Sequence, residues 1–191
     1  MYKRQRVTRS VRLGALLDDA DKETLTALGI DDPTQIDIEG MTTTAAGGVL
    51  LGLKSPVDSG GALIWHLADP DALLRTGALA SAGLTLWGRV LLTVMADGEH
   101  VPGGIADLLE LPDGTLLVTA TASGAADPKS QDGALFHVAG IPGLSNPTLV
   151  HTFPGLKPEG VARTRTGDGL VVVFDTGAET PLWTEVPWSA T

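Results

Sequence analysis

Ile38-Glu39-Gly40-Met41 opens the sequence unit that decides the fold, because this unit returns twice along the chain. The second copy opens with Gly104-Ile105-Ala106-Asp107 and the third with Pro158-Glu159-Gly160-Val161. Each opening leads through a short glycine-containing turn to an apolar run, such as Leu170-Val171-Val172-Val173 in the third copy. Repeats of this kind typically stack small β-sheets, of which β-propeller blades are the commonest. We therefore expect an all-β fold.

The spacing of strand-like segments predicts a partial β-propeller of about two four-stranded blades plus an incomplete third. Val, Leu and Thr fill these segments, and Gly, Pro, Asp and Ser separate them, as in short antiparallel strands. The blades are expected at residues 36–103, 104–157 and 158–191. Evenly spaced short strands also fit a β-sandwich or a small irregular barrel, so these folds stay open as alternatives. The expected strands are 37–43, 49–53, 62–67, 86–94, 104–111, 115–121, 134–138, 148–153, 159–164, 170–174 and 182–186.

The region before the repeats, residues 6–35, reads as a remnant strand, one short helix and a linker. Residues 7–16 alternate loosely, which predicts the strand, and residues 18–28 have a capping aspartate and a closing glycine, which predict the helix. Residues 1–5 resemble the translation of an adapter used in sequencing libraries, although an ordinary basic tail has the same composition. If residues 1–5 come from an adapter, the gene is longer, and missing N-terminal blades are expected to cover the open edge of the partial propeller.

The composition excludes some classes of partner. A net charge of −10 argues against nucleic acid, because phosphate binding needs clustered Lys and Arg. No apolar run reaches the ~18–20 residues of a membrane-spanning helix, so no membrane span is expected. The chain has no cysteine, which excludes disulfides and thiolate metal sites. The compartment stays open, with a periplasmic or secreted location slightly favoured.

The motifs also resemble a bacterial β-propeller family of unknown function that is related to phytase-like and esterase-like propellers. The resemblance rests on Asp37-Ile38-Glu39-Gly40, on the run Leu50 to Pro56, on Gly104 to Leu108, and on Pro158-Glu159-Gly160-Val161 with Val173 to Gly177. The family has arginine where this chain has Lys54 and Ala106, which puts an inherited anion-binding role in doubt. The resemblance implies a propeller fold from about residue 36 to the C-terminus.

Three acidic residues are the candidate metal ligands. In a propeller the first strand of each blade lines the central channel, so Glu39, Asp107 and Glu159 are expected to converge there. Converging carboxylates repel unless a cation lies among them, and oxygen ligands suit calcium. Related propellers hold calcium with channel carboxylates, so the resemblance implies the same here. In the alternative interpretation, Glu39 and Glu159 accept backbone N–H groups where blades meet.

Lys54 and Asp175 are the candidate ligand-binding residues, because both fall at the ends of second strands, near the expected channel mouth. Each also fits a plain turn position. His100 is a general-base candidate by residue type, although a surface histidine is the favoured interpretation, because nothing in the sequence supplies a partner for it. Two functions follow: a scaffold that binds a small-molecule or protein ligand at the propeller face, or a metal-dependent hydrolase of phosphate or other esters. No nucleophile motif is present, which favours the scaffold.

Overall fold

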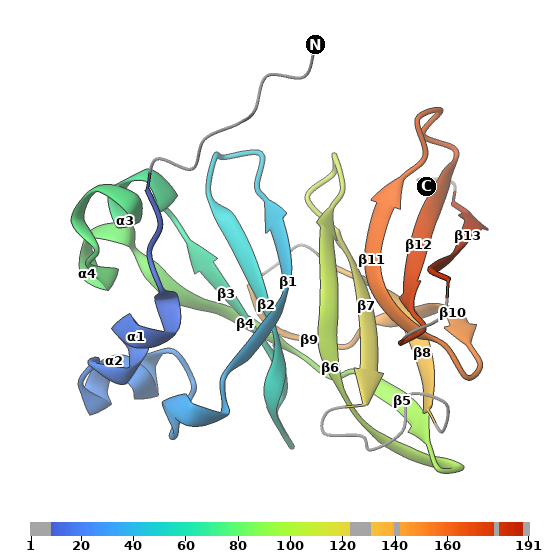
Figure 1. Cartoon of the computed structure of the whole chain (residues 1–191), viewed down its shortest axis with the longest axis horizontal. Coiled ribbons are helices and arrows are strands. Elements are labelled where there is room, and N and C mark those ends of the chain that lie inside the picture. Colours follow the sequence, from blue (N-terminus) through green and yellow to red (C-terminus); the bar gives the residue numbers. More distant parts are fainter. Residues whose placement is uncertain (1–8, 123–130, 140–141, 178–179, 189–191) are drawn as a thin grey trace.

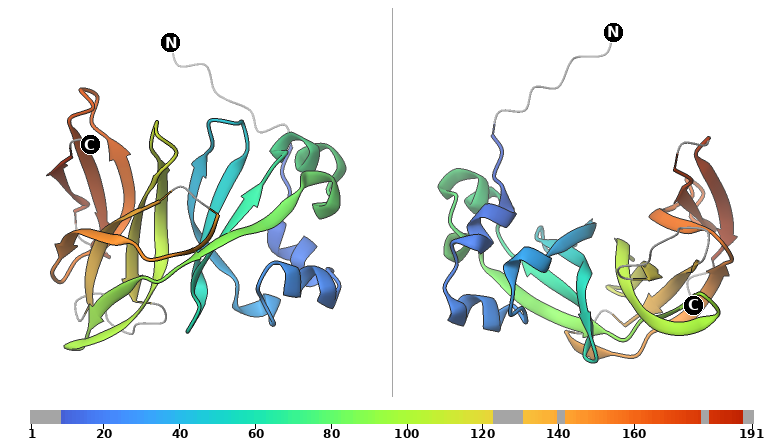
Figure 2. Two further views of the ribbon diagram at one scale, coloured as in Figure 1. Left: turned by 180° about the vertical axis from the view of Figure 1, so that it is seen from behind. Right: turned by 60° about the horizontal axis from the view of Figure 1, so that its bottom comes forward.

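The protein, described here from a computed structural model that covers residues 9–122, 131–139, 142–177 and 180–188, consists mostly of β-strands. The strands form three sheets that stand side by side along the long axis of the molecule (Figure 1). A second view shows that the row bends into an arc whose two ends stay apart (Figure 2). The all-β prediction is confirmed, but the three described sheets do not make a closed propeller.

The first sheet contains β1 (Asp37–Thr43), β2 (Val49–Asp58), β3 (Gly61–Leu67) and β4 (Leu84–Val90), paired antiparallel in chain order. A fifth strand, β9 (Gly143–Ser145), comes from much later in the chain and pairs parallel to β4. The first four strands thus form an antiparallel meander, and the fifth ties the first sheet to the second half of the chain.

The second sheet contains β5 (Thr93–Ala96), β6 (Glu99–Glu110), β7 (Leu116–Ala122), β8 (Gln131–Val138) and β10 (Thr148–Phe153). Strand β5 pairs with both β6 and β8, and β7 also pairs with both β6 and β8. These four strands therefore pair in a closed cycle, which is a feature of a small barrel rather than of a flat blade.

The third sheet contains only three strands within the described residues: β11 (Lys157–Arg163), β12 (Gly169–Asp175) and β13 (Leu182–Pro187). They pair antiparallel in chain order, like the first strands of the first sheet. The third sheet lies at one end of the row, and the N-terminal helices lie at the other (Figure 1).

Apolar side chains fill both junctions between the sheets, and burial of such surface is the main force that holds the row together. Gly40 and Gly52 let the first sheet approach Ile105 and Leu108 closely, because neither glycine carries a side chain. The core between the first and second sheets includes Leu50, Ile64, Val90, Ile105, Leu108, Val118 and Phe136. The core between the second and third sheets includes Leu117, Leu135, Phe153, Val161, Leu170, Val172 and Phe174.

Four short α-helices and one 3-10 turn flank the first sheet: α1 (Leu13–Asp18), α2 (Lys22–Ala27), η1 (Pro33–Gln35), α3 (Pro70–Thr76) and α4 (Leu79–Ala82). Helices α2 and α3 each begin after an aspartate whose side chain accepts a backbone N–H bond. The Asp21 carboxylate accepts from the N–H of Thr24 at 2.7 Å, and the Asp69 carboxylate accepts from the N–H of Ala72 at 2.7 Å. Apolar residues of α1 and α2 then pack on the outer face of the first sheet, above the fully buried Trp65.

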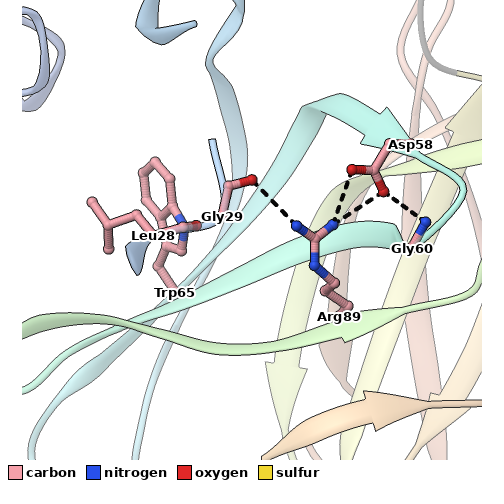
Figure 3. A network of polar contacts seen from close by, with 6 residues as sticks. All are labelled: Leu28, Gly29, Asp58, Gly60, Trp65 and Arg89. Atoms are coloured by element: carbon pink, nitrogen blue, oxygen red, sulfur yellow. Dashed lines mark hydrogen bonds and ion pairs between the residues drawn. The ribbon is translucent and has the colours of Figure 1, made fainter. Parts of the chain in front are cut away.

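A network of polar contacts fixes the chain after α2 to the first sheet (Figure 3). The Trp65 indole Nε1 donates to the Leu28 carbonyl at 2.9 Å. The Arg89 guanidinium donates to the Gly29 carbonyl at 3.3 Å and also pairs with the Asp58 carboxylate at 3.1 Å. Because one arginine bridges two segments far apart in sequence, the helices are held on this face as part of the fold.

Three local expectations need correction. Residues 13–18 form helix α1 where a remnant strand over 7–16 was expected, and the expected single helix over 18–28 is shortened to α2. The expected strand 86–94 is divided between β4 and β5, which belong to different sheets.

The adapter-like residues 1–5 lie outside the described residues. No helix in the described ranges is long and apolar enough to cross a membrane.

Candidate functional site

The strands that carry the three repeat openings, β1, β6 and β11, each contain a β-bulge, and these bulges align the repeats. The register of β1 slips between Ile38 and Gly40, and that of β11 slips between Pro158 and Gly160. Glu39 and Glu159 are therefore the extra residues at equivalent bulges. A bulge re-aims the side chain it carries and is frequent beside functional sites. Both glutamates thus occupy the same position in different sheets.

The middle sheet departs from this pattern. The register of β6 slips between Ile105 and Asp107, so Ala106 takes the bulge position. Asp107 comes one residue later, at the position that Gly40 and Gly160 hold in the other two sheets. The three acids were expected at equivalent positions. The two glutamates do hold equivalent positions, but Asp107 lies one residue further along its strand.

Glu39 pairs with Lys54, one of the two residues expected to bind a ligand. The Lys54 ammonium lies 3.2 Å from the Glu39 carboxylate, and their side chains are 10% and 26% exposed. Lys54 lies inside β2, between the residues that pair with Asp37 and Ile38, and so opposite the bulge. The expected turn position of Lys54 is therefore wrong, and its charge is directed at a partner within the same sheet.

Glu159 makes a similar pair in the third sheet with Lys157, which lies on the same strand. The Lys157 ammonium is 2.6 Å from the Glu159 carboxylate, and their side chains are 21% and 31% exposed. Burial acts to lower the pKa of Lys157, but the Glu159 carboxylate, with smaller contributions from Glu39 and Asp175, outweighs burial and raises this pKa. The residues after the two glutamates both lie beside Asp107, since a Cβ at Gly40 would lie 3.3 Å from its backbone and a Cβ at Gly160 would lie 3.8 Å from its carboxylate, so the two pairs lie close together.

Asp107 has a different environment. Its carboxylate accepts a hydrogen bond from the Val161 backbone N–H at 2.8 Å, which joins the second sheet to the third. Burial raises the pKa of Asp107, against the lowering effect of backbone N–H groups of Val161, Leu108 and Met41, and the nearby Glu159 carboxylate adds to the rise. The hydrogen-bonding role proposed for the glutamates at sheet junctions is thus filled by Asp107.

The structure brings four of the predicted site residues and one further residue into a single group. We call Glu39, Lys54, Lys157, Glu159 and Asp175 the charged cluster. Asp175 pairs in register with Lys157, and its carboxylate contributes to the raised pKa of that lysine. Lys157 is not among the site residues predicted from the sequence. Its position two residues before Glu159 was the signal, because residues i and i+2 of a strand point to the same face.

The predicted calcium ligands do not fit a ready-made metal site. Glu39 and Glu159 are each paired with a lysine, and Asp107 holds the backbone of the next sheet. Within the ranges that the structure describes, no group of three or more Asp, Glu or His side chains is arranged to hold a metal ion.

His100 lies away from the charged cluster. It lines a hollow of about 200 Å³ at the start of β6, together with Asp58, Ser59 and residues around Leu92. Asp58 is already paired with Arg89. The general-base role of His100 stays a prediction.

Comparison with known proteins identifies no relative: no family model, no curated protein and no solved structure matches this chain.

Proposed function

We propose that this protein is a binding scaffold that holds a cationic group at the charged cluster. The observation that carries the proposal is an excess of negative charge around paired lysines. The carboxylates of Glu39, Glu159 and Asp175 surround the ammonium groups of Lys54 and Lys157. Together these groups carry three negative and two positive charges, and the excess negative charge attracts an additional positive group.

The accessibility of the cluster supports the same ligand class. In both ion pairs the glutamate is more exposed than its lysine, so an incoming ligand meets the carboxylates first. Partly exposed ion pairs contribute only about 0–1 kcal/mol to stability. A ligand ammonium group can therefore take a share of these carboxylates at little cost to the fold.

We also infer that the three sheets are propeller-type units. Support comes from the chain-order pairing of β1 to β4 and of β11 to β13, and from the bulges in β1, β6 and β11, which carry the three repeat openings. In a propeller the first strand of each blade lines the ligand-binding channel. The cycle of β5 to β8 is the main departure from this pattern.

A thermal-unfolding titration with spermidine at low salt tests the binding proposal. Spermidine is expected to raise the melting temperature of the wild-type protein, because a ligand that binds only the folded state stabilises it. The double variant Glu39→Gln, Glu159→Gln is expected to lose this response. The double variant Glu23→Gln, Glu99→Gln, which removes two exposed acids, is the matched control for loss of net charge and is expected to keep it.

Two results would count against the proposal. One is an unchanged melting temperature with spermidine, and the other is an equal rise in the wild type and the double variant. Calcium chloride forms a second arm of the experiment. A rise with calcium but not with spermidine, lost in the double variant, would return the carboxylates to the predicted metal site and to the metal-dependent hydrolase.

A further inference from the structure

A second hollow, larger than the one beside His100, lies where the helices flank the first sheet. Its volume is about 740 Å³, and it is lined by residues of α1, α2, α4 and the start of β4. Helices α1 and α2 lie on one side of this end of the molecule, and α3 and α4 lie on the other (Figure 1). Binding sites for small molecules usually have volumes of about 300–1,000 Å³. The size of the hollow therefore suits a small molecule.

Leucine side chains form much of the wall of this hollow. Leu16 comes from α1, Leu79 comes from α4, and Leu84 and Leu86 come from β4. All four leucines are only half-buried, so part of their apolar surface is left in contact with water. Removal of such surface from water is favourable. The hollow therefore favours a ligand with an apolar body.

The charged side chains that line the hollow all have the same sign. They are Asp19 and Asp21, and both are exposed. Hydrogen bonds from Thr24 lower the pKa of Asp21, so this carboxylate is ionised at neutral pH. No Lys, Arg or His is found among the described residues that line the hollow. Its charge is therefore complementary to a cationic group and repels an anion.

Hydrogen bonds hold both sides of the hollow in place. On one side, the Leu28 carbonyl at the end of α2 accepts from the Trp65 indole at 2.9 Å. On the other side, the Ala82 carbonyl at the end of α4 accepts from the Asp69 backbone N–H at 2.9 Å. A site whose walls are already fixed loses less conformational entropy when a ligand binds.

We propose that this hollow binds a small amine with an apolar body. The body lies against the leucines, and the ammonium group lies near Asp19 and Asp21. None of the residues that line the hollow belongs to the charged cluster. The hollow is therefore a site separate from the one of the proposed function, and it selects for apolar surface as well as for positive charge.

Titration of the full chain with 2-phenylethylamine at low salt, followed by NMR of the backbone amides, tests the proposal. Amide signals of α1, α2, α4 and β4 are expected to shift. The double variant Asp19→Asn, Asp21→Asn is expected to bind about two- to fivefold more weakly, the range of an exposed ion pair, and asparagine still caps α2. The matched control Asp97→Asn, Asp113→Asn, at two exposed turn residues, is expected to bind like the wild type.

A second set of variants fills the hollow. Ala80→Trp places a large side chain there from an exposed position of α4 and is expected to abolish the shifts. Ala46→Trp, in the exposed turn between β1 and β2, is the matched control and is expected to keep them. The amide spectrum shows whether each variant is folded, and Ala27→Trp repeats the test from α2 if Ala80→Trp unfolds.

Three results would overturn the proposal. The first is a wild-type spectrum unchanged by the amine, or shifts that persist in Ala80→Trp. The second is equal binding of the neutral analogue 2-phenylethanol, which would remove the role of the acids. The third is loss of amine binding in Glu39→Gln, Glu159→Gln, which would assign the amine to the charged cluster. Binding that survives in this variant supports the hollow even if the cluster does not bind spermidine.

Discussion

Replacing Gly52 by alanine tests the packing of the first sheet on the second. A Cβ atom at this position would lie 2.5 Å from Ile105 Cγ2 and 3.0 Å from Leu108 Cδ1, whereas ordinary contacts begin at 3.4 Å. Ile105 is fully buried, so it has little room to move away. Overpacking of a filled core costs about 1–3 kcal/mol. At about 2–4 °C per kcal/mol for a chain of this size, the melting temperature of Gly52→Ala should fall by several degrees.

Urea unfolding followed by circular dichroism measures the change, with Gly14→Ala as the control. Gly14 lies in α1 with no heavy atom near its Cβ position, so alanine there should leave stability unchanged or raise it by up to about 1 kcal/mol. Ile105→Ala removes the clashing methyl group. The double variant should therefore be less destabilised than the two single effects combined. A Gly52→Ala protein as stable as the wild type, or strictly additive effects, would refute this packing.

Two further predictions follow from buried polar groups. Because the folded-state pKa of Asp107 is raised above 3.8, the folded protein keeps this proton at pH values where the unfolded chain has lost it. The wild type should therefore gain stability relative to Asp107→Asn as the pH falls from the raised pKa towards 3.8. Urea unfolding at each pH measures the free energy of unfolding of both proteins. A difference between these free energies that stays constant from neutral pH to about pH 4 would contradict the prediction. Trp65→Phe leaves the buried Leu28 carbonyl without its 2.9 Å partner, so the free energy of unfolding should fall by about 1–3 kcal/mol and amide exchange in α2 should become faster. The control Trp87→Phe, at a half-buried residue, should cost less stability. Equal amide exchange in the wild type and Trp65→Phe would show that this bond does not hold the helix.

Most of the strands could be predicted from the sequence, because their signals are local. Apolar β-branched runs between glycine and aspartate turns placed β1, β3, β7 and β12 within one or two residues of their observed bounds. Sheet membership could not be predicted in the same way. Strand β9 joins the first sheet, and β5 joins the second, through pairings with distant segments. Helix α1 was missed because Val11, Leu13 and Ala15 alternate loosely, as in a strand, and the packing of the helix on the first sheet is not visible in the sequence.

The candidate site was predicted in part. The repeats indicated Glu39 and Glu159, and the structure places both at equivalent bulges. The sequence could not reveal that Ala106 takes the third bulge position, because a one-residue shift of register leaves the motif unchanged. It also could not pair Lys54 with Glu39, since the two residues lie on different strands whose register is set by that bulge.

The central claim is that the first and third sheets bring their charged pairs into one cluster. The most direct test is the pKa of the Lys157 ammonium group, measured by NMR in the wild type and in Glu39→Gln. Glu39 and Lys157 lie on separate sheets, so Glu39 can affect the pKa of Lys157 only if the two sheets bring these side chains close together. The pKa of Lys157 should be above 10.5 in the wild type and should fall in Glu39→Gln, because Glu39 contributes to the rise. An identical pKa in both proteins would contradict the claim.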